Sequence, residues 1–188
     1  YRNLSFPNKI FCWIAMSFGI LIKGPIIIIF TFFPLIIFSV LRKRNFIKDI
    51  WSTFGFVLLL LITIPWFVLI NIKSGGAFWY ESVGNDLFNK VKSGQESHGF
   101  PPGYYSLLLF IFFWPGSIFI INLFLRMKER FKYILKKDYF SFYLIISFGF
   151  PLIIFELIPT KLPHYIFPSY LPLSILVAKS IIDNLSLI

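Results

Sequence analysis

The sequence predicts an all-α, polytopic membrane protein, and three observations support this fold class. The chain of 188 residues is 57% hydrophobic, 21% aromatic and 14% charged, with a mean hydropathy of +0.80. Soluble chains average about 45–50% apolar and about 25% charged residues, so this composition excludes disorder and disfavours a soluble domain. The second observation is that the apolar stretches have the length of helices. The third is that the basic residues are confined between these stretches.

Charge and cysteine content exclude further classes of protein. The single cysteine, Cys12, excludes a disulfide framework and a cysteine-based zinc site. The net charge is +10, but the basic residues lie between apolar stretches rather than on one face, so we expect no nucleic-acid partner. The chain starts at Tyr1 without a signal peptide, and we therefore expect one membrane domain, residues 1–188, that is part of a longer protein.

Six apolar stretches predict helices that cross a bilayer, which requires about 20 mostly apolar residues. In order, they are Ile10–Ile22, Pro25–Leu41, Ile50–Ile72, Pro102–Leu125, Tyr139–Ile158 and His164–Ile182. None of them alternates with a period of two residues, so a membrane β-barrel is excluded. The sequence therefore predicts a helical bundle of about six spans.

Particular residues explain where these stretches begin, bend and end. A Lys-Gly-Pro turn at residues 23–25 separates the first two, with proline at the first helical position of the second. The third, fourth and fifth contain Pro65, Pro115 and Pro151. Membrane helices tolerate such prolines where neighbouring groups satisfy the freed carbonyls.

The distribution of lysine and arginine predicts the orientation. One side of the membrane would carry thirteen of them: Arg2, Lys9, Arg42, Lys43, Arg44, Lys48, Arg126, Lys128, Arg130, Lys132, Lys136, Lys137 and Lys179. The other side would carry five: Lys23, Lys73, Lys90, Lys92 and Lys161. The richer side is expected to be cytoplasmic, and membrane lipid is an expected partner.

Two outer loops, residues 73–101 and 159–163, contain the candidate functional residues. In the first, Trp79, Val83, Leu87 and Val91 recur every fourth residue, which predicts an amphipathic helix on the outer face. This helix either lies along the membrane surface or packs on the bundle as a connector. The loop ends near His98, which is either a solvated bystander or binds an anionic headgroup, transfers a proton or ligates a metal.

The second outer loop brings basic and hydroxyl groups together in a proline-rich segment. Lys161, His164 and Tyr165 precede an expected helix start, a combination suited to binding phosphate. The alternative is a proline-rich hairpin with a snorkelling Lys161. Glu156 either pairs with Lys161 or ligates a cation, and Lys23 either reaches an anion or marks a turn.

Three segments, taken together, resemble bacterial membrane glycosyltransferases of the aminoarabinose transferase and dolichyl-phosphate-mannose–protein mannosyltransferase families. KLPHYIFPSYLPL at residues 161–173 resembles their "KLPHYLLPLYPALA" signature, and LIKGP at 21–25 is similar to "LTKGP". GGAFW at 75–79, followed by HGFPPGYY at 98–105, resembles the outer loop that ends in "HGQPPWYY". The matches occur in order across nearly the whole chain.

The resemblance implies a C-type glycosyltransferase of the bacterial inner membrane, multi-pass, with its active face in the periplasm. The donor would be a sugar on a polyprenyl phosphate, and the acceptor a lipid A-like glycolipid or a protein. Carried over onto this sequence, Lys161 and Tyr165 contact the lipid phosphate and His98 lies near the phosphate or a divalent cation. We also place Lys23 and His164 among the phosphate-binding residues, and His98 and Glu156 are the candidate ligands of a divalent cation, with no other cofactor expected.

One departure from the family pattern affects the expected activity. Family members have an acidic motif in their first outer loop, whereas residues 1–50 contain only Asp49. We expect the catalytic acidic residue upstream of Tyr1, so this chain alone is expected to lack it. The alternatives to an enzyme are a lipid-binding remnant without catalysis and a fragment of a transporter or flippase, a class that typically shows internal repeats.

Overall fold

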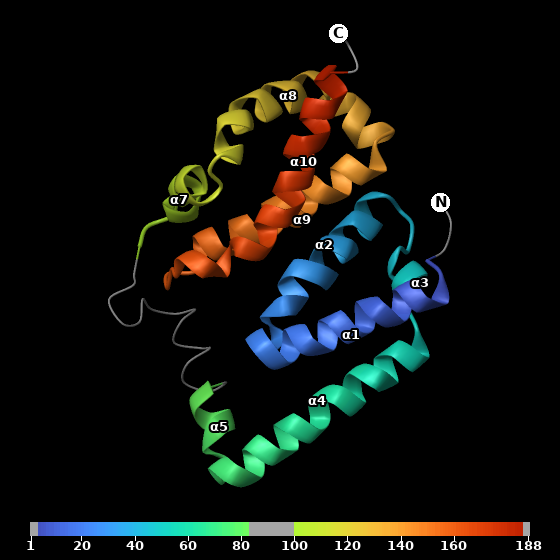
Figure 1. The fold of residues 1–188 in the computed structure, drawn as a ribbon, viewed down its shortest axis with the longest axis vertical. Helices are drawn as coiled ribbons and strands as arrows, with labels where there is room; N and C mark the ends of the chain where they lie inside the picture. Colours follow the sequence, from blue (N-terminus) through green and yellow to red (C-terminus); the bar gives the residue numbers. More distant parts are fainter. Residues whose placement is uncertain (1–3, 83–99, 186–188) are drawn as a thin grey trace. The chain divides into compact units, whose positions relative to one another are not determined.

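A computed structural model describes residues 4–82 and 100–185, and every regular element in these ranges is helical. This confirms the predicted all-α fold class. The chain divides into two compact units, Tyr1–Asn89 and Lys90–Ile188, which are described in turn and drawn in Figure 1. The expected single membrane domain stays a prediction.

In the described part of the first unit, residues 4–82, there are three long helices and three short ones. They are α1 (Phe6–Lys23), η1 (Gly24–Ile26), α2 (Ile27–Leu41), α3 (Ile47–Ile50), α4 (Thr53–Ser74) and α5 (Ala77–Trp79). The predicted turn between the first two apolar stretches is present, with Gly24 at φ 68°, a backbone angle that glycine adopts readily. Helix α1 begins earlier than predicted, at Phe6, because Pro7 suits a first turn in which its missing N–H is not needed.

Helices α1 and α4 pack side by side, as Figure 1 shows, and Trp13 of α1 lies at their contact. The Trp13 side chain is buried, and its indole N–H donates a hydrogen bond to the Ile50 carbonyl at 3.2 Å. A Cβ atom added at Gly55 would lie 2.4 Å from Trp13 Cδ1. The glycine therefore permits the close approach of the two helices, and Met16 and Leu59 complete the small core.

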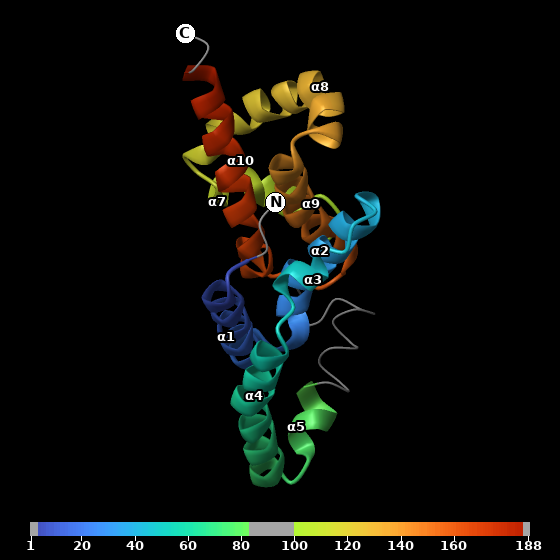
Figure 2. The same cartoon turned by 90° about the vertical axis from the view of Figure 1, so that its right-hand side faces the viewer.

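Between residues 100 and 185, the described part of the second unit, there are four main helices and two short 3₁₀ turns. They are α7 (Tyr104–Phe112), η3 (Gly116–Phe119), α8 (Ile120–Lys136), α9 (Tyr139–Leu157), η4 (Pro163–Tyr165) and α10 (Phe167–Leu185). Figures 1 and 2 show α9 and α10 packed together, with α8 between α7 and the start of α9. The core joins all four helices through Leu109, Ile120, Leu123, Leu144, Leu173, Leu176 and Val177.

The predicted fourth span is broken into two helical segments. Helix α7 and the following Gly116–Leu125 segment meet at a bend of 115°. Pro115 lies at the break, where it lacks a backbone donor and its ring clashes with the preceding turn. The basic stretch after Leu125, predicted as a loop, continues as helix α8 to Lys136.

Two described helices are long and apolar enough to cross a bilayer, α4 with 22 residues and α9 with 19. The bent pair would make a third, whereas α2 and the apolar part of α10 are shorter. By length and composition the described residues thus contain two or three candidate spans, each of the six predicted stretches contains helix, and the number of about six spans stays a prediction. Large apolar side chains such as Leu61 and Leu157 are exposed on α4 and α9, as expected for helices that face lipid.

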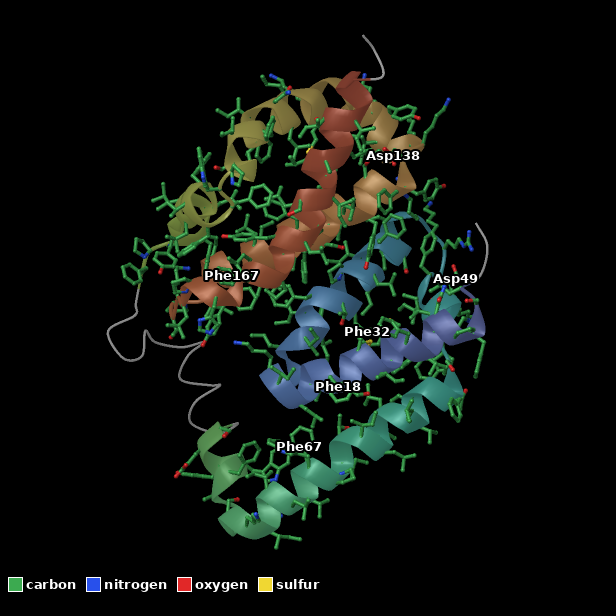
Figure 3. All side chains as sticks on the ribbon, viewed as in Figure 1. Phe18, Phe32, Asp49, Phe67, Asp138 and Phe167 are labelled. Atoms are coloured by element: carbon green, nitrogen blue, oxygen red, sulfur yellow. The ribbon has the colours of Figure 1, made fainter. Side chains whose placement is uncertain are left out.

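Both ends of α9 have a lysine–carboxylate pair. At its N-terminus, Asp138 accepts a hydrogen bond from the Ser141 backbone N–H at 3.0 Å and pairs with Lys179 of α10. Figure 3 labels Asp138 at this end of α9, and Phe167 marks the start of α10 near its other end. The second pair, Glu156 and Lys161, lies at the C-terminal end, among the candidate site residues.

Candidate functional site

Lys161 is buried in the segment that joins α9 to α10, with 1% of its side chain exposed. Its ammonium donates three hydrogen bonds to backbone carbonyl oxygens, at 3.0, 2.6 and 3.0 Å, which belong to Phe155, Glu156 and Ile158. The last carbonyls of a helix have no partner within the helix. Lys161 therefore caps the C-terminus of α9, where a positive charge also complements the helix dipole.

Glu156 performs the complementary role at the N-terminus of α7. Its carboxylate accepts hydrogen bonds from the backbone N–H groups of Gly103 and Ser106, each at 2.8 Å, and from the Ser106 hydroxyl at 3.0 Å. These backbone donors belong to the first turn, where N–H groups lack helical partners. A carboxylate is also stabilised by the positive end of the helix dipole.

The two charged side chains also contact each other. Lys161 Nζ lies 3.7 Å from Glu156 Oε2. Burial lowers the pKa of Lys161 below its usual value, and the nearby Glu156 carboxylate opposes that shift. We call these two residues the Glu156–Lys161 pair. It joins the end of α9 to the beginning of α7 with every polar group of the pair satisfied.

Tyr105 provides a further connection between the same two segments. Its side chain is fully buried, and its hydroxyl donates a hydrogen bond to the Leu162 carbonyl at 3.1 Å. The Lys161 ammonium lies 5.5 Å from the centre of the Tyr105 ring, within the range of a cation–π interaction. Nearby, the Phe100 N–H donates to the Pro159 carbonyl at 3.4 Å.

His164 and Tyr165 lie in the short turn η4, immediately before α10. The Tyr165 N–H donates to the Leu162 carbonyl at 3.0 Å, which closes the turn. The Tyr165 ring is half-buried against Phe155, with ring centres 5.8 Å apart. The exposed His164 ring is in T-shaped contact with the Tyr165 ring, with centres 4.9 Å apart. The predicted irregular backbone is present here, and α10 starts only at Phe167.

The structure brings only some of the predicted site residues together. Lys161, His164, Tyr165 and Glu156 occupy one continuous segment of the second unit. Lys23 is the exposed last residue of α1, in the first unit. His98 lies outside the described residues, as does most of the predicted outer amphipathic helix; only its beginning is described, at α5.

The sequence left alternative roles for Glu156 and Lys161, and the geometry bears on both residues. Glu156 pairs with Lys161, one of its two predicted alternatives, and both of its oxygens accept hydrogen bonds from α7. Among residues 4–82 and 100–185, no three His, Cys, Asp or Glu side chains cluster as metal ligands would. The cation site at His98 and Glu156 stays a prediction, and so does phosphate binding by Lys161, whose donors are already used.

Sequence reasoning missed the partners of Glu156. Gly103 and Ser106 are separated from it by about fifty residues of chain, and no local spacing connects them. The available signal was the helix start itself: Pro-Pro-Gly before Tyr104 begins a helix without a Ser, Thr, Asp or Asn at the capping position. Such a helix requires a capping group from elsewhere, and Glu156 provides it.

Comparison with known proteins identifies relatives of this chain. The chain matches no established protein-family profile. It is 24% identical to the undecaprenyl phosphate-alpha-4-amino-4-deoxy-L-arabinose arabinosyl transferase 1 of Pseudomonas fluorescens, over 95% of this chain and 32% of the relative. An uncharacterized protein of Aquifex aeolicus is 26% identical over 88% of this chain and 36% of its own length. The chain thus spans about a third of the length of these curated relatives.

A solved structure provides the deciding comparison. The crystal structure of ArnT from Cupriavidus metallidurans bound to undecaprenyl phosphate superposes on 92% of this chain and 30% of its own, with a TM-score of 0.72 and 24% identity. This chain has the fold of part of ArnT. The resemblance to the aminoarabinose transferases that the three sequence segments indicated is therefore confirmed, and it extends over nearly all of the chain.

Proposed function

We propose that the protein containing this chain is a membrane glycosyltransferase that uses a polyprenyl-phosphate sugar as donor. The observation that carries the proposal is the match of 92% of the chain to a protein crystallised with undecaprenyl phosphate. The named Pseudomonas relative, an undecaprenyl phosphate-aminoarabinose transferase, supports the same donor class. The acceptor is a lipid A-like glycolipid or a protein, and the active face is periplasmic, as the distribution of basic residues favours.

The proposed reaction is a displacement at the anomeric carbon of the donor sugar. The acceptor oxygen forms the new bond to that carbon, the bond to the phosphate oxygen breaks, and polyprenyl phosphate leaves with the electron pair. Where the acceptor is a hydroxyl, its proton passes to the acidic residue that the family resemblance implies. The protein must stabilise this anionic leaving group, and oriented donors in a poorly hydrated site are most effective for that. Hydroxyl, imidazole and ammonium groups provide such donors.

We assign the phosphate-binding role to the segment before α10 and to two residues elsewhere in the sequence. Tyr165 and His164 occupy the turn η4, and their rings are in T-shaped contact with centres 4.9 Å apart. Lys23 ends α1 and is exposed, so its ammonium is accessible to an anion. His98 is included because of the sequence resemblance alone.

A transfer assay tests this function in the complete natural protein, reconstituted in nanodiscs with radiolabelled undecaprenyl phosphate-aminoarabinose and lipid A. We expect Tyr165→Phe to reduce transfer roughly 10- to 100-fold, because a hydrogen bond to a charged group contributes about 1.5–3 kcal/mol. Tyr133→Phe, at an exposed tyrosine of α8, is the matched control and should transfer at the wild-type rate.

The result also separates the enzyme from its main alternative. Transfer by the wild-type protein that depends on Tyr165 supports the proposal. Binding of undecaprenyl phosphate without any transfer, with lipid A and with a protein acceptor, would favour a lipid-binding protein without catalysis. Equal transfer by wild type and Tyr165→Phe would reject the assignment of Tyr165.

A further inference from the structure

We infer that the Glu156–Lys161 pair positions the phosphate-binding turn, and that Lys161 does not itself contact the phosphate. The inference rests on the proposed function, because it concerns how the same site is built. It assigns Glu156 and Lys161 the role of positioning residues for the turn that contains His164 and Tyr165. The two roles for Lys161, ligand and positioning residue, make opposite predictions about Glu156.

The hydrogen bonds of Lys161 are the first argument. A lysine ammonium has three N–H donors and no acceptor. All three are directed at backbone carbonyls of the α9 terminus, at 2.6–3.0 Å, and the side chain is 1% exposed. A phosphate could be bound only by breaking one of these bonds and exposing a buried carbonyl, which costs free energy.

The charge balance is the second argument. The Glu156 carboxylate lies 3.7 Å from the ammonium and compensates its charge. An anion approaching Lys161 would therefore also approach a carboxylate. Because the carboxylate is held by the N-terminus of α7 through Gly103 and Ser106, it cannot move away without leaving those N–H groups unpaired.

The contacts from the pair to the turn are the third argument. Lys161 binds the carbonyl of Phe155, whose ring packs on Tyr165. Lys161 also contacts the ring of Tyr105, whose hydroxyl binds the Leu162 carbonyl. That same carbonyl accepts the hydrogen bond of the Tyr165 N–H. The ring and the backbone of Tyr165 are thus both fixed by residues that the pair holds.

Binding of undecaprenyl phosphate by variants of the complete natural protein in nanodiscs tests this inference. We expect Lys161→Met and Glu156→Ala each to weaken binding roughly tenfold or more, the size typical of groups that orient a ligand-binding side chain. The double variant should bind no more weakly than the worse single variant, because both changes remove one unit. Glu156→Gln, which keeps one acceptor oxygen, should lie between wild type and Glu156→Ala.

The other lysine–carboxylate pair of α9 provides the matched control. Lys179→Met breaks the Asp138–Lys179 pair at the opposite end of the same helix. It should lower thermal stability, though by less than Lys161→Met, because 32% of the Lys179 side chain is exposed against 1% for Lys161. If the Glu156–Lys161 pair positions the turn, Lys179→Met keeps the wild-type dissociation constant within about twofold, the resolution of such a titration. If loss of stability alone weakened binding, both variants would bind more weakly in proportion to their loss of thermal stability, and that result would overturn the inference.

The remaining outcomes separate the inference from the proposed function. Direct binding of phosphate by Lys161 predicts that Glu156→Ala and Glu156→Gln bind undecaprenyl phosphate as tightly as wild type or more tightly, because a repelling charge is removed. That result, or unchanged binding by both Glu156→Ala and Lys161→Met, overturns the inference while the proposed function stands. A wild-type protein that does not bind undecaprenyl phosphate overturns the proposed function and, with it, this role for the pair.

Discussion

Asp138 shows how one residue can stabilise a helix start and a helix–helix contact together. Its carboxylate caps α9 through the Ser141 N–H and pairs with Lys179 of α10. Burial by itself would raise the pKa of Asp138, but the hydrogen bonds from Lys179 and Ser141 outweigh this effect and hold the pKa below its usual value. The ionised form is therefore favoured by the folded state.

The lowered pKa predicts how stability depends on pH. A carboxyl group whose pKa is lower in the folded protein stabilises it fully above the unfolded-state pKa of about 3.9, and this contribution is lost as the pH falls through the folded-state value. Asp138→Asn should therefore lower the melting temperature at pH 7, and the difference from wild type should shrink below about pH 4. Thermal unfolding in detergent at several pH values measures this difference.

Asp138→Ala provides a comparison, because it removes the cap as well as the charge. Loss of an N-cap costs about 1 kcal/mol, so this variant should be less stable than Asp138→Asn at every pH. A melting-temperature difference between wild type and Asp138→Asn that stays constant from pH 7 to pH 3 would contradict the assigned role.

At the scale of elements, the contact between α1 and α4 depends on a glycine. The Trp13 ring occupies the space where a Gly55 side chain would lie. Gly55→Ala should destabilise the protein by about 1–3 kcal/mol, the usual cost of inserting a methyl group into a packed site. Thermal unfolding checks this, and Gly149→Ala on α9, where a Cβ would meet nothing within 4 Å, should be close to neutral. If Gly55→Ala and Gly149→Ala were equally stable, the close approach of α1 and α4 at Gly55 would not contribute to the free energy of unfolding.

The elements themselves were largely predictable from apolar stretches, and their ends were less so. Helices α4 and α9 match their predicted ranges to within three residues, because each is one long apolar stretch. The break at Pro115 was not predicted, because a proline can either kink a membrane helix or end it, and packing decides between these outcomes. Helix α8 was hidden because its basic residues resemble an orientation signal.

The candidate site was predictable in composition but not in its contacts. The turn with Lys161, His164 and Tyr165 was identified from its own sequence. The use of the Lys161 ammonium could not be predicted, because its carbonyl partners are backbone groups that carry no residue identity. The same holds for Glu156, whose partners on α7 are mainly backbone N–H groups distant in sequence.

At the scale of the whole molecule, the distribution of basic residues predicts which loops face each side of the membrane. The single Cys12 of this chain makes this testable, since replacing it with alanine leaves these 188 residues free of cysteine. In that background, Lys73→Cys and Lys137→Cys each place one thiol at an exposed position. A membrane-impermeant maleimide added to intact spheroplasts should label the first, and should label the second only after permeabilisation. The reverse pattern would invert the proposed orientation.

The charged pairs at both ends of α9 have a consequence for movement within the bilayer. The helix has 19 residues, or about 28 Å at 1.5 Å per residue, close to the roughly 30 Å thickness of the hydrocarbon layer. A shift of α9 along its own axis, in either direction, would move one of the two charged pairs into the hydrocarbon layer. Thinner or thicker bilayers must therefore be accommodated by tilting, and the depth at which Tyr165 sits should vary little from one lipid mixture to another.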